Sequence, residues 1–215
     1  MQSSPILVIG ATGKTGSRVA DLLDAAGHNV RRASRSSETP FDWEDTETWA
    51  PALAGVSAVY ITYYPDLAFP GVPEKFQVLT EMAAAAGVGR LVMLAGRGEP
   101  RAEACEDVVR NSGIDYTLVR AAWFAQNFSE GFLYDSVMEG MLVLPAGKVG
   151  EPFVDLDDVA EVVVAALTDP RHAGQVYELT GPRLLTFDDA AAELSCKTRS
   201  NIGPQKRLRF AVVAE

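Results

Sequence analysis

The residues with the clearest chemistry form a glycine-rich loop near the start of the chain. The loop reads Gly10-Ala11-Thr12-Gly13-Lys14-Thr15-Gly16 and lies between an apolar run, residues 6–9, and a stretch of helical periodicity. In such a loop the first glycine permits a tight turn, the second lets a pyrophosphate approach the backbone, and the third lets helix and strand pack closely. The N-terminus of the following helix presents free N–H groups to the anion. At the first strand-to-helix turn of an alternating chain this spacing predicts a dinucleotide site, and a glycine-rich turn without a ligand is the alternative.

The end of the second expected strand indicates which nucleotide the loop accepts. A site for NAD usually has a carboxylate here, about 20 residues past the loop, which bonds the ribose 2′-hydroxyl. This chain has three arginines within residues 31–35, and the next carboxylate after them is Glu38. Guanidinium groups and hydroxyls suit a 2′-phosphate, so Arg35 and Ser34 are the first candidates, with Lys14 as a helper. The pattern predicts NADP(H) in preference to NAD(H), and a solvated basic loop is the alternative.

The elements that must position these residues follow from the hydrophobic pattern. Short apolar runs alternate with stretches of helical periodicity, which predicts a parallel sheet with crossover helices. Strands are expected at residues 6–9, 29–33, 41–43, 57–62, 90–95 and 116–119, and helices at 46–54, 74–86 and 103–111. The expected fold class is α/β, a Rossmann-like doubly wound parallel sheet with a small C-terminal substrate lobe that we expect to be truncated.

The chain divides into three expected regions. Residues 1–120 form the nucleotide-binding core, residues 121–195 supply the remaining Rossmann elements and the substrate lobe, and residues 196–215 form an atypical basic tail. In the second region, strands are expected at 141–144 and 175–179, a helix at 157–167, and a further helix capped by Thr186.

The chain resembles the NmrA-like group of atypical short-chain dehydrogenases and reductases. The resemblance runs from residue 5 to about residue 195. Besides the glycine loop and the Arg35 turn, the matching pieces are residues 87–92, 112–120, 123–128, 152–155, 158–160 and 177–182. Phe41-Asp42-Trp43 with Thr48-Trp49 is similar to a subgroup related to the festuclavine and agroclavine reductases of ergot-alkaloid metabolism. Members of the group include NADPH-dependent quinone and azo-type reductases, ene- and imine-type reductases, and redox sensors that bind NADP(H) without catalysis.

The resemblance implies further contacts with the cofactor. It places Thr62, Tyr63 and Tyr64 in contact with the cofactor beyond the fourth strand, and Ala95 and Gly96 beside the nicotinamide ribose. It also implies that residues 120–124 border the nicotinamide face. Asp42 is a further candidate cofactor-binding residue. Ala121 stands where relatives often have proline, so the backbone there is expected to differ.

The usual proton donor of a short-chain dehydrogenase is missing from the sequence. These enzymes pair a tyrosine with a lysine four positions later, because the lysine lowers the tyrosine pKa so that the phenol can protonate a carbonyl oxygen. None of the five lysines has a tyrosine four positions before it. Tyr116 has Arg120 at that spacing, but arginine does not shuttle protons. The catalytic residues are therefore unknown from the sequence.

Hydride transfer to a quinone-like, conjugated or iminium acceptor needs no acid from the protein, because solvent can protonate the product. Such a site needs an oriented cofactor and a flat aromatic platform. The candidates for the substrate site are Tyr64, Trp123, Phe124, Asn127 and Phe128, with Tyr63 as a further aromatic. Core packing is the alternative role for each aromatic ring, and Asn127 orients either the lobe or the substrate.

No metal site or disulfide framework is expected. Cys105 and Cys196 are too few and too far apart for either, and Cys105 suits a packed helical position. His28 follows the glycine that ends a helix and is expected to cap the helix or to be exposed, and His172 belongs to an expected surface turn. The carboxylates of residues 155–158 precede a helix and suit capping better than cation binding.

The charge of the chain divides unevenly. Residues 1–195 carry 14 basic and 28 acidic groups, whereas residues 196–215 carry five basic groups and one acidic group. An acidic body argues against direct binding of nucleic acid and against anionic membrane surfaces. No apolar run approaches the roughly 20 residues that span a bilayer, and the N-terminus does not read as a signal peptide, so a cytoplasmic protein is expected.

The basic end coincides with the place where the resemblance fades, at residues 196–201. We therefore expect a shortened or altered C-terminus with an added strand near residues 208–213, and a substrate lobe more open than in relatives. The oligomeric state is left open, a homodimer included.

Two functions follow as hypotheses. The first is an NADPH-dependent reductase that transfers hydride to a small, electron-poor acceptor. The alternative is a non-catalytic NADP(H)-binding redox sensor. A sugar-nucleotide epimerase or dehydratase is disfavoured, because it needs the missing tyrosine–lysine pair.

Overall fold

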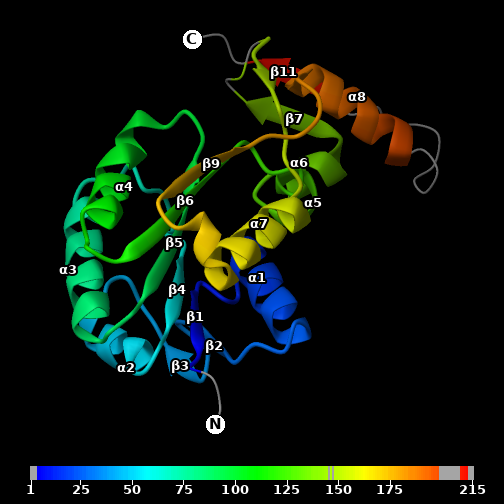
Figure 1. Cartoon of the computed structure of the whole chain (residues 1–215). Helices are drawn as coiled ribbons and strands as arrows, with labels where there is room; N and C mark the ends of the chain where they lie inside the picture. Colours follow the sequence, from blue (N-terminus) through cyan, green and yellow to red (C-terminus); the bar gives the residue numbers. More distant parts are fainter. Residues whose placement is uncertain (1–3, 145, 147, 199–208, 213–215) are drawn as a thin grey trace. The chain divides into compact units, whose positions relative to one another are not determined.

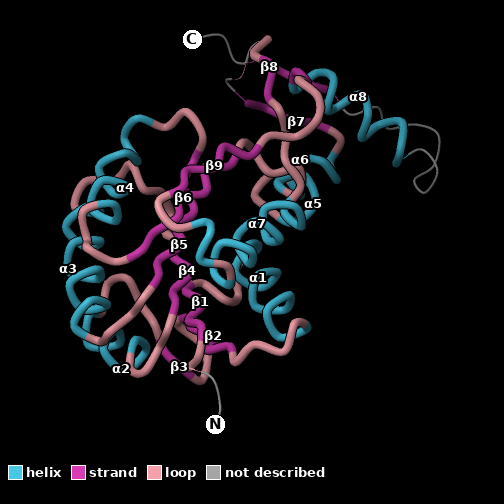
Figure 2. Tube along the Cα trace, in the orientation of Figure 1, coloured by secondary structure: helices cyan, strands magenta, loops and turns pink. Residues whose placement is uncertain are grey.

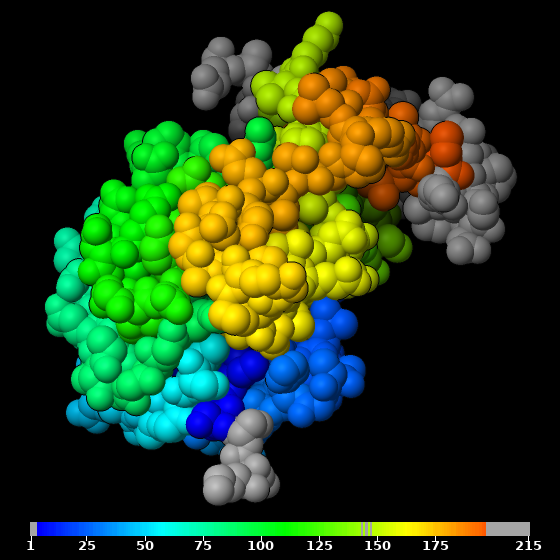
Figure 3. Space-filling view, in the orientation of Figure 1, coloured from blue at the N-terminus to red at the C-terminus, as the bar shows by residue number. Residues whose placement is uncertain are grey.

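The computed structural model describes residues 4–144, 146, 148–198 and 209–212 (Figures 1 and 2). The chain forms two units, each built from two segments. Unit 1 comprises residues 1–121 and 156–179, and unit 2 comprises residues 122–155 and 180–215. Figure 3 shows residues 156–179 of unit 1, in yellow and orange, against the earlier part of the same unit.

Unit 1 is a seven-stranded, all-parallel sheet with the strand order β3-β2-β1-β4-β5-β6-β9. The strands are β1 (Ile6–Ile9), β2 (Val30–Ser34), β3 (Thr39–Pro40), β4 (Ala58–Ile61), β5 (Arg90–Gly96), β6 (Asp115–Ala121) and β9 (Gln175–Leu179). The first six follow the order of a Rossmann fold, in which the strand sequence reverses beside β1. The predicted doubly wound parallel sheet is confirmed.

Helices cover both faces of this sheet (Figure 1). One face carries α1 (Lys14–Ala25) and α7 (Leu156–Thr168); the other carries α2 (Trp49–Leu53), α3 (Val72–Ala85) and α4 (Glu103–Arg110). Three short 3₁₀ turns, η1 (Thr46–Thr48), η2 (Pro100–Ala102) and η3 (Pro170–His172), complete the unit. The central strands β1 and β4 are buried along their whole length, as expected for parallel strands covered on both sides.

The core on the α2–α4 face is rich in aromatic side chains. Trp43 stacks on Phe76 with ring centroids 5.3 Å apart and meets Trp49 edge to face at 5.6 Å. Trp49 and Phe76 are completely buried, and Phe41 stacks on Trp49 at 5.7 Å. These rings pack beneath the carboxyl ends of β3 and β4, so they hold those two strand ends in place.

The third strand differs from its expected position. It was predicted at residues 41–43, but it lies at Thr39–Pro40 and pairs with Ala33 and Ser34. Phe41 turns into the aromatic core, and the Asp42 carboxylate accepts a hydrogen bond from the Glu44 backbone N–H at 3.0 Å. An aspartate that bonds the backbone two residues ahead favours a turn over a strand.

Unit 2 is a small lobe built around a few aromatic and aliphatic side chains. Its elements are α5 (Asn127–Glu130), α6 (Tyr134–Glu139), β7 (Met141–Leu144), β8 (Gly150–Glu151), β10 (Leu185–Thr186), α8 (Phe187–Thr198) and β11 (Arg209–Val212). The predicted cap of the last helix is confirmed, because Thr186 Oγ1 accepts the Asp189 backbone N–H at 3.1 Å. The strand expected near residues 208–213 is present as β11, which pairs in parallel with β7. Residues 196–198 of the expected basic tail form the end of α8, and residues 199–208 and 213–215 lie outside the described residues.

None of the helices in the described part of the chain is long and apolar enough to cross a membrane.

The core of unit 1 predicts effects of very different size for substitutions at two neighbouring residues of α3. Leu79 is 1% exposed, whereas Val78 is 41% exposed. Leu79→Ala removes buried methyl groups and should lower the free energy of unfolding by about 2–5 kcal/mol. Val78→Ala should change it by less than about 0.5 kcal/mol. Urea denaturation of both variants checks the pair, and similar losses in the two would contradict this packing.

Candidate functional site

The glycine loop joins β1 to α1 with contacts that only glycine permits. Gly10 has φ +73°, and a Cβ on it would lie 2.7 Å from Thr62 Cγ2. A Cβ on Gly16 would lie 2.2 Å from the Gly10 carbonyl oxygen. The predicted tight turn at Gly10 and the close helix–strand packing at Gly16 are therefore confirmed. The approach of a pyrophosphate at Gly13 stays a prediction.

The N-terminus of α1 is suited to an anion. The residue before the helix is Gly13, so no side chain caps the helix, and the first turn contains no acidic residue. A helix N-terminus without a side-chain cap, at the positive end of the helix dipole, favours an anionic ligand. Thr12 and Gly13 are exposed, whereas Thr15 is buried with 7% exposure. Thr12 and Gly13 are thus the most exposed of the predicted loop residues, and Gly10 and Lys14 are half-buried.

The three arginines near the end of β2 have different partners. Arg31 donates to the carbonyls of Ala52 and Ala54, both at 2.7 Å. Arg32 points to the opposite face of the sheet, where it bonds carboxylates of α1, Asp21 at 2.7 Å and Asp24 at 2.5 Å. Those bonds, with Asp24 the largest contributor, raise the pKa of Arg32. Two of the three guanidinium groups are therefore already engaged.

Arg35 differs from both. It is exposed, and its side chain makes no ion pair or hydrogen bond with any residue that the structure describes. It belongs to a tight turn in which the Ser34 backbone N–H donates to Ser37 Oγ at 2.7 Å. Ser34 Oγ accepts the Ser36 backbone N–H at 3.4 Å, and Ser34 is 7% exposed. The turn therefore presents Arg35 to solvent and buries most of Ser34.

The other cofactor residues expected near β4 lie close to the loop. Trp43 donates its indole N–H to the Thr62 carbonyl at 3.3 Å, and Trp43 meets the Tyr63 ring edge to face at 4.9 Å. The Asp42 carbonyl accepts the Trp49 indole N–H at 2.7 Å. These contacts bring Asp42, Thr62 and Tyr63 together at the carboxyl ends of β3 and β4, next to Gly10. Whether they touch a cofactor stays a prediction.

Ala95 and Gly96 end β5 at the same edge of the sheet. They pair in register with Arg120 and Ala121 of β6. Ala95 is 5% exposed, whereas Gly96 is exposed. Arg120, which the resemblance implies beside the nicotinamide, donates to Glu106 from Nε at 2.8 Å and from Nη2 at 2.6 Å.

Glu106 was missed by the sequence reasoning, although a signal was present. It lies on the buried side of α4 with Cys105 and Val109 and is only 1% exposed. A carboxylate on the core side of a helix needs a cation and hydrogen bonds. Its position in the amphipathic pattern could have identified it as the partner of an arginine.

The expected substrate residues of unit 2 have different environments. Phe128 is 7% exposed and packs with Phe153 at 5.4 Å, so it belongs to the core of that unit. Trp123 is 38% exposed and meets Phe187 edge to face at 5.1 Å. Phe124 and Asn127 are half-buried. In unit 1, Tyr64 is 80% exposed. The substrate roles of all five stay predictions.

No other described group offers chemistry of its own. Burial raises the pKa of the Cys105 thiol to about 11, which disfavours the reactive thiolate. Asp157 pairs with Arg18 at 2.7 Å, and Asp155 accepts from Gln126 at 2.8 Å. Among the described residues, no three histidine, cysteine or acidic side chains gather around a metal position.

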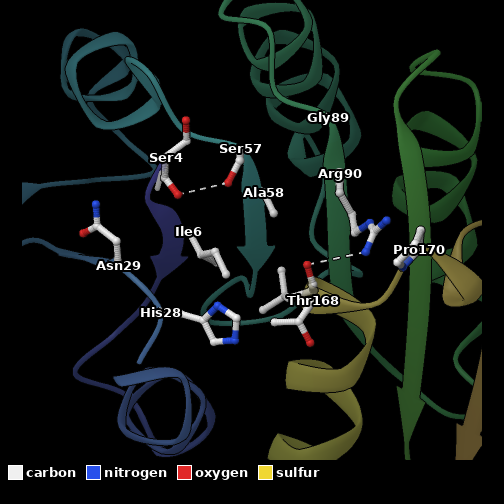
Figure 4. A pocket seen from close by; sticks show the side chains of 11 residues that line it. Ser4, Ile6, His28, Asn29, Ser57, Ala58, Gly89, Arg90, Thr168 and Pro170 are labelled. Atoms are coloured by element: carbon white, nitrogen blue, oxygen red, sulfur yellow. Dashed lines mark hydrogen bonds between the residues drawn. The ribbon is translucent and has the colours of Figure 1, made fainter. Parts of the chain in front are cut away.

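A depression of about 400 Å³ lies at the amino ends of the strands, the edge opposite the glycine loop (Figure 4). His28, Ser57 and Arg90 are among its lining residues. Arg90 donates to the carbonyls of Ala166 and Leu167, at 3.2 and 3.5 Å, at the end of α7. A cation that satisfies the last carbonyls of a helix has a structural role there.

The fold and the loop define a nucleotide-binding protein of the Rossmann type. A nucleoside-diphosphate-sugar epimerase from Staphylococcus aureus has the same fold, with a TM-score of 0.79, 21% identity, and coverage of 98% of this chain and 80% of that one. An NADPH-dependent quinone oxidoreductase from Escherichia coli, solved with NADPH, has a TM-score of 0.72 and 22% identity, with coverage of 97% of this chain and 78% of that one. No family model matches the chain.

Curated relatives identify the family. Agroclavine dehydrogenase of Claviceps fusiformis is 34% identical over 222 residues, which cover 92% of this chain and 74% of the relative. The NAD(P)H azoreductase of Xenophilus azovorans is 32% identical over 216 residues, which cover 88% of this chain and 72% of the relative. The chain belongs to the NmrA-like group of atypical short-chain dehydrogenases and reductases.

The loop geometry predicts a large effect of one methyl group. Gly16→Ala places a Cβ against the Gly10 carbonyl, so it should lower the free energy of unfolding by about 1–3 kcal/mol and weaken nucleotide binding. Gly89→Ala is the control, because its nearest atom, the Ser57 carbonyl oxygen, is 3.5 Å from the new Cβ and its φ is not positive. Denaturant unfolding and NADPH titration compare the two, and equal effects would contradict the role of Gly16.

Proposed function

We propose that the chain is an NADPH-dependent reductase that transfers hydride to a small, electron-poor acceptor. The observation that carries this proposal is the position of Arg35, an exposed arginine without a described partner, beside a glycine loop that leaves a helix N-terminus open. Relatives with reductase and dehydrogenase names, the azoreductase among them, support the reaction class.

The described residues fit a dinucleotide. Cβ atoms at Gly10 and Gly16 would collide with Thr62 and with the Gly10 carbonyl, so glycine at both positions keeps the loop compact at the start of α1. In this proposal the N–H groups at the start of α1 bind the pyrophosphate, and Arg35 binds the 2′-phosphate with charge-assisted hydrogen bonds. When bound, NADPH supplies the hydride.

The protein's part in the chemistry is then orientation. The chain has no tyrosine–lysine pair to deliver a proton, and Tyr60, whose hydroxyl is completely buried, has its pKa raised by burial. An acceptor that becomes stable on receiving hydride, or that solvent can protonate, suits such a site. Quinone-like, conjugated and iminium acceptors meet that condition. The exposed ring of Tyr64 in unit 1 is one candidate for contact with them, and Trp123 in unit 2 is a separate one.

A redox sensor is the second candidate, and the missing proton donor favours it. A sensor binds NADP(H) without turnover and needs different affinities for the oxidised and reduced cofactor, since only a differential affinity can shift an equilibrium.

The preference for NADPH over NADH can be tested by substitution of Arg35. Arg35→Ala should weaken NADPH binding about 10- to 100-fold and leave NADH binding unchanged, because it removes hydrogen bonds to a charged phosphate. Arg32→Ala removes the same charge three residues earlier, in β2, but Arg32 binds Asp21 and Asp24, so this variant should change neither affinity. Fluorescence titration measures the affinities of both variants for NADPH and NADH. An unchanged ratio of the NADPH and NADH affinities in Arg35→Ala would contradict the proposed role of Arg35 in binding the 2′-phosphate.

The choice between a reductase and a redox sensor can be tested by measuring turnover. We expect the wild-type protein to oxidise NADPH in the presence of at least one member of a panel of quinones, azo dyes, enones and iminium ions. The decrease in absorbance of NADPH follows the reaction. No turnover with any acceptor, together with unequal affinities for NADP⁺ and NADPH, would favour the sensor instead.

A further inference from the structure

A chain of ion pairs links the carboxyl ends of β5, β6 and β9. We name it the Glu106 network; its members, in order, are Arg110, Glu106, Arg120, Glu178 and Arg97. Glu106 Oε2 accepts from Arg110 at 3.1 Å and from Arg120 at 2.6 Å. Glu178 accepts from Arg120 at 3.5 Å through Oε1 and from Arg97 at 3.2 Å through Oε2. The network thus runs from α4 across the sheet edge to the residue that follows β5.

Glu106 is the anchor of this network. Its side chain is 1% exposed, and both of its oxygens accept from the Arg120 guanidinium in a two-point contact. Such paired, charge-assisted contacts fix orientation more strongly than single bonds. The outer members are more accessible, because the side chains of Glu178 and Arg97 are 49% and 42% exposed. The buried Glu106 therefore contributes most to fixing the orientation of the side chains in the network.

The strand register carries this order to the end of β5. Arg120 lies opposite Ala95 on one side and opposite Glu178 on the other. The Arg97 backbone N–H donates to the Ala121 carbonyl at 2.9 Å, while its side chain binds Glu178. The segment from Ala95 to Arg97 is thus held by both its backbone and a side chain.

The network and the Arg35 turn lie on different parts of the same sheet. β5 is two strands from β1, with β4 between them, whereas Arg35 follows β2 on the other side of β1. A dinucleotide on the glycine loop would have its 2′-phosphate at the β2 side and its nicotinamide half toward β5. The two halves of the ligand can therefore be tested separately.

We propose that Glu106 is a positioning residue for the nicotinamide half of the cofactor site. Through Arg120, Glu178 and Arg97 it fixes the backbone of residues 95–97, against which that half of NADPH binds. This inference rests on the proposed binding of NADPH at the glycine loop.

The test compares two ligands in the wild-type protein and three variants. NADPH occupies both halves of the site, whereas adenosine 2′,5′-bisphosphate occupies the adenosine half alone. Glu106→Gln removes the charge and keeps the shape of the side chain. Asp107→Asn is the matched control, because Asp107 is the adjacent carboxylate on α4, binds Arg110 at 2.7 Å, and is 63% exposed.

We expect Glu106→Gln to weaken NADPH binding at least fivefold in calorimetric titration and to leave binding of the bisphosphate within twofold of wild type. Asp107→Asn should bind both ligands like wild type. Glu178→Gln removes an exposed member without leaving a buried charge unpaired, so it should also weaken NADPH binding and not bisphosphate binding, by less than Glu106→Gln does, and this holds even where Glu106→Gln folds poorly.

The outcomes separate the two proposals. If both ligands weaken equally in Glu178→Gln, or neither weakens, the positioning role is refuted while NADPH binding stands. A wild-type protein that binds neither ligand refutes the proposed function, and this inference with it.

Discussion

The contact between Gly16 and the Gly10 carbonyl is the constraint on which the rest of unit 1 depends. Because no Cβ stands between them, α1 begins directly against the end of β1. The same loop bonds the neighbouring strand, since the Ala11 backbone N–H donates to the Ala33 carbonyl at 3.1 Å, and Gly10 abuts Thr62 after β4. A single tight junction therefore brings together the helix N-terminus and the ends of β1, β2 and β4.

The charged residues around this junction follow from the period of a strand. Successive side chains of β2 point to opposite faces, so Arg31 reaches the end of α2 and Arg32 reaches α1. Arg35 comes after the last residue of the strand and has no helix to pair with. The same distinction between structural and available charge applies to Arg120, whose guanidinium is held by Glu106.

The sequence predicts the elements well where the local pattern decides them. The strands at residues 175–179 and 141–144 and the cap at Thr186 agree with the structure, because alternation, apolar runs and capping are local properties. The third strand lies earlier than predicted, since Phe41 packs into a core formed by residues far along the chain. The Glu106–Arg120 pair joins a helix to a strand, so its contact depends on how the two elements face each other.

The candidate site, like the fold, is predictable from the sequence only where local spacing determines it. The glycine roles follow from spacing, whereas the different partners of three nearby arginines require the position of two helices. Phe128 and Trp123 read alike in the sequence, but one is buried and the other is not. Burial of this kind depends on tertiary packing, which no local pattern records.

The order of the two units along the chain has an evolutionary consequence. Residues 122–155 are inserted between β6 and α7, two elements of unit 1, and the second segment of unit 2 follows β9, the last strand of the sheet. Substitutions, insertions and deletions in unit 2 therefore interrupt no strand of the parallel sheet. Selection can alter this unit while the glycine loop and its supporting strands are conserved. A family with this architecture can diversify in one unit under a constant requirement in the other.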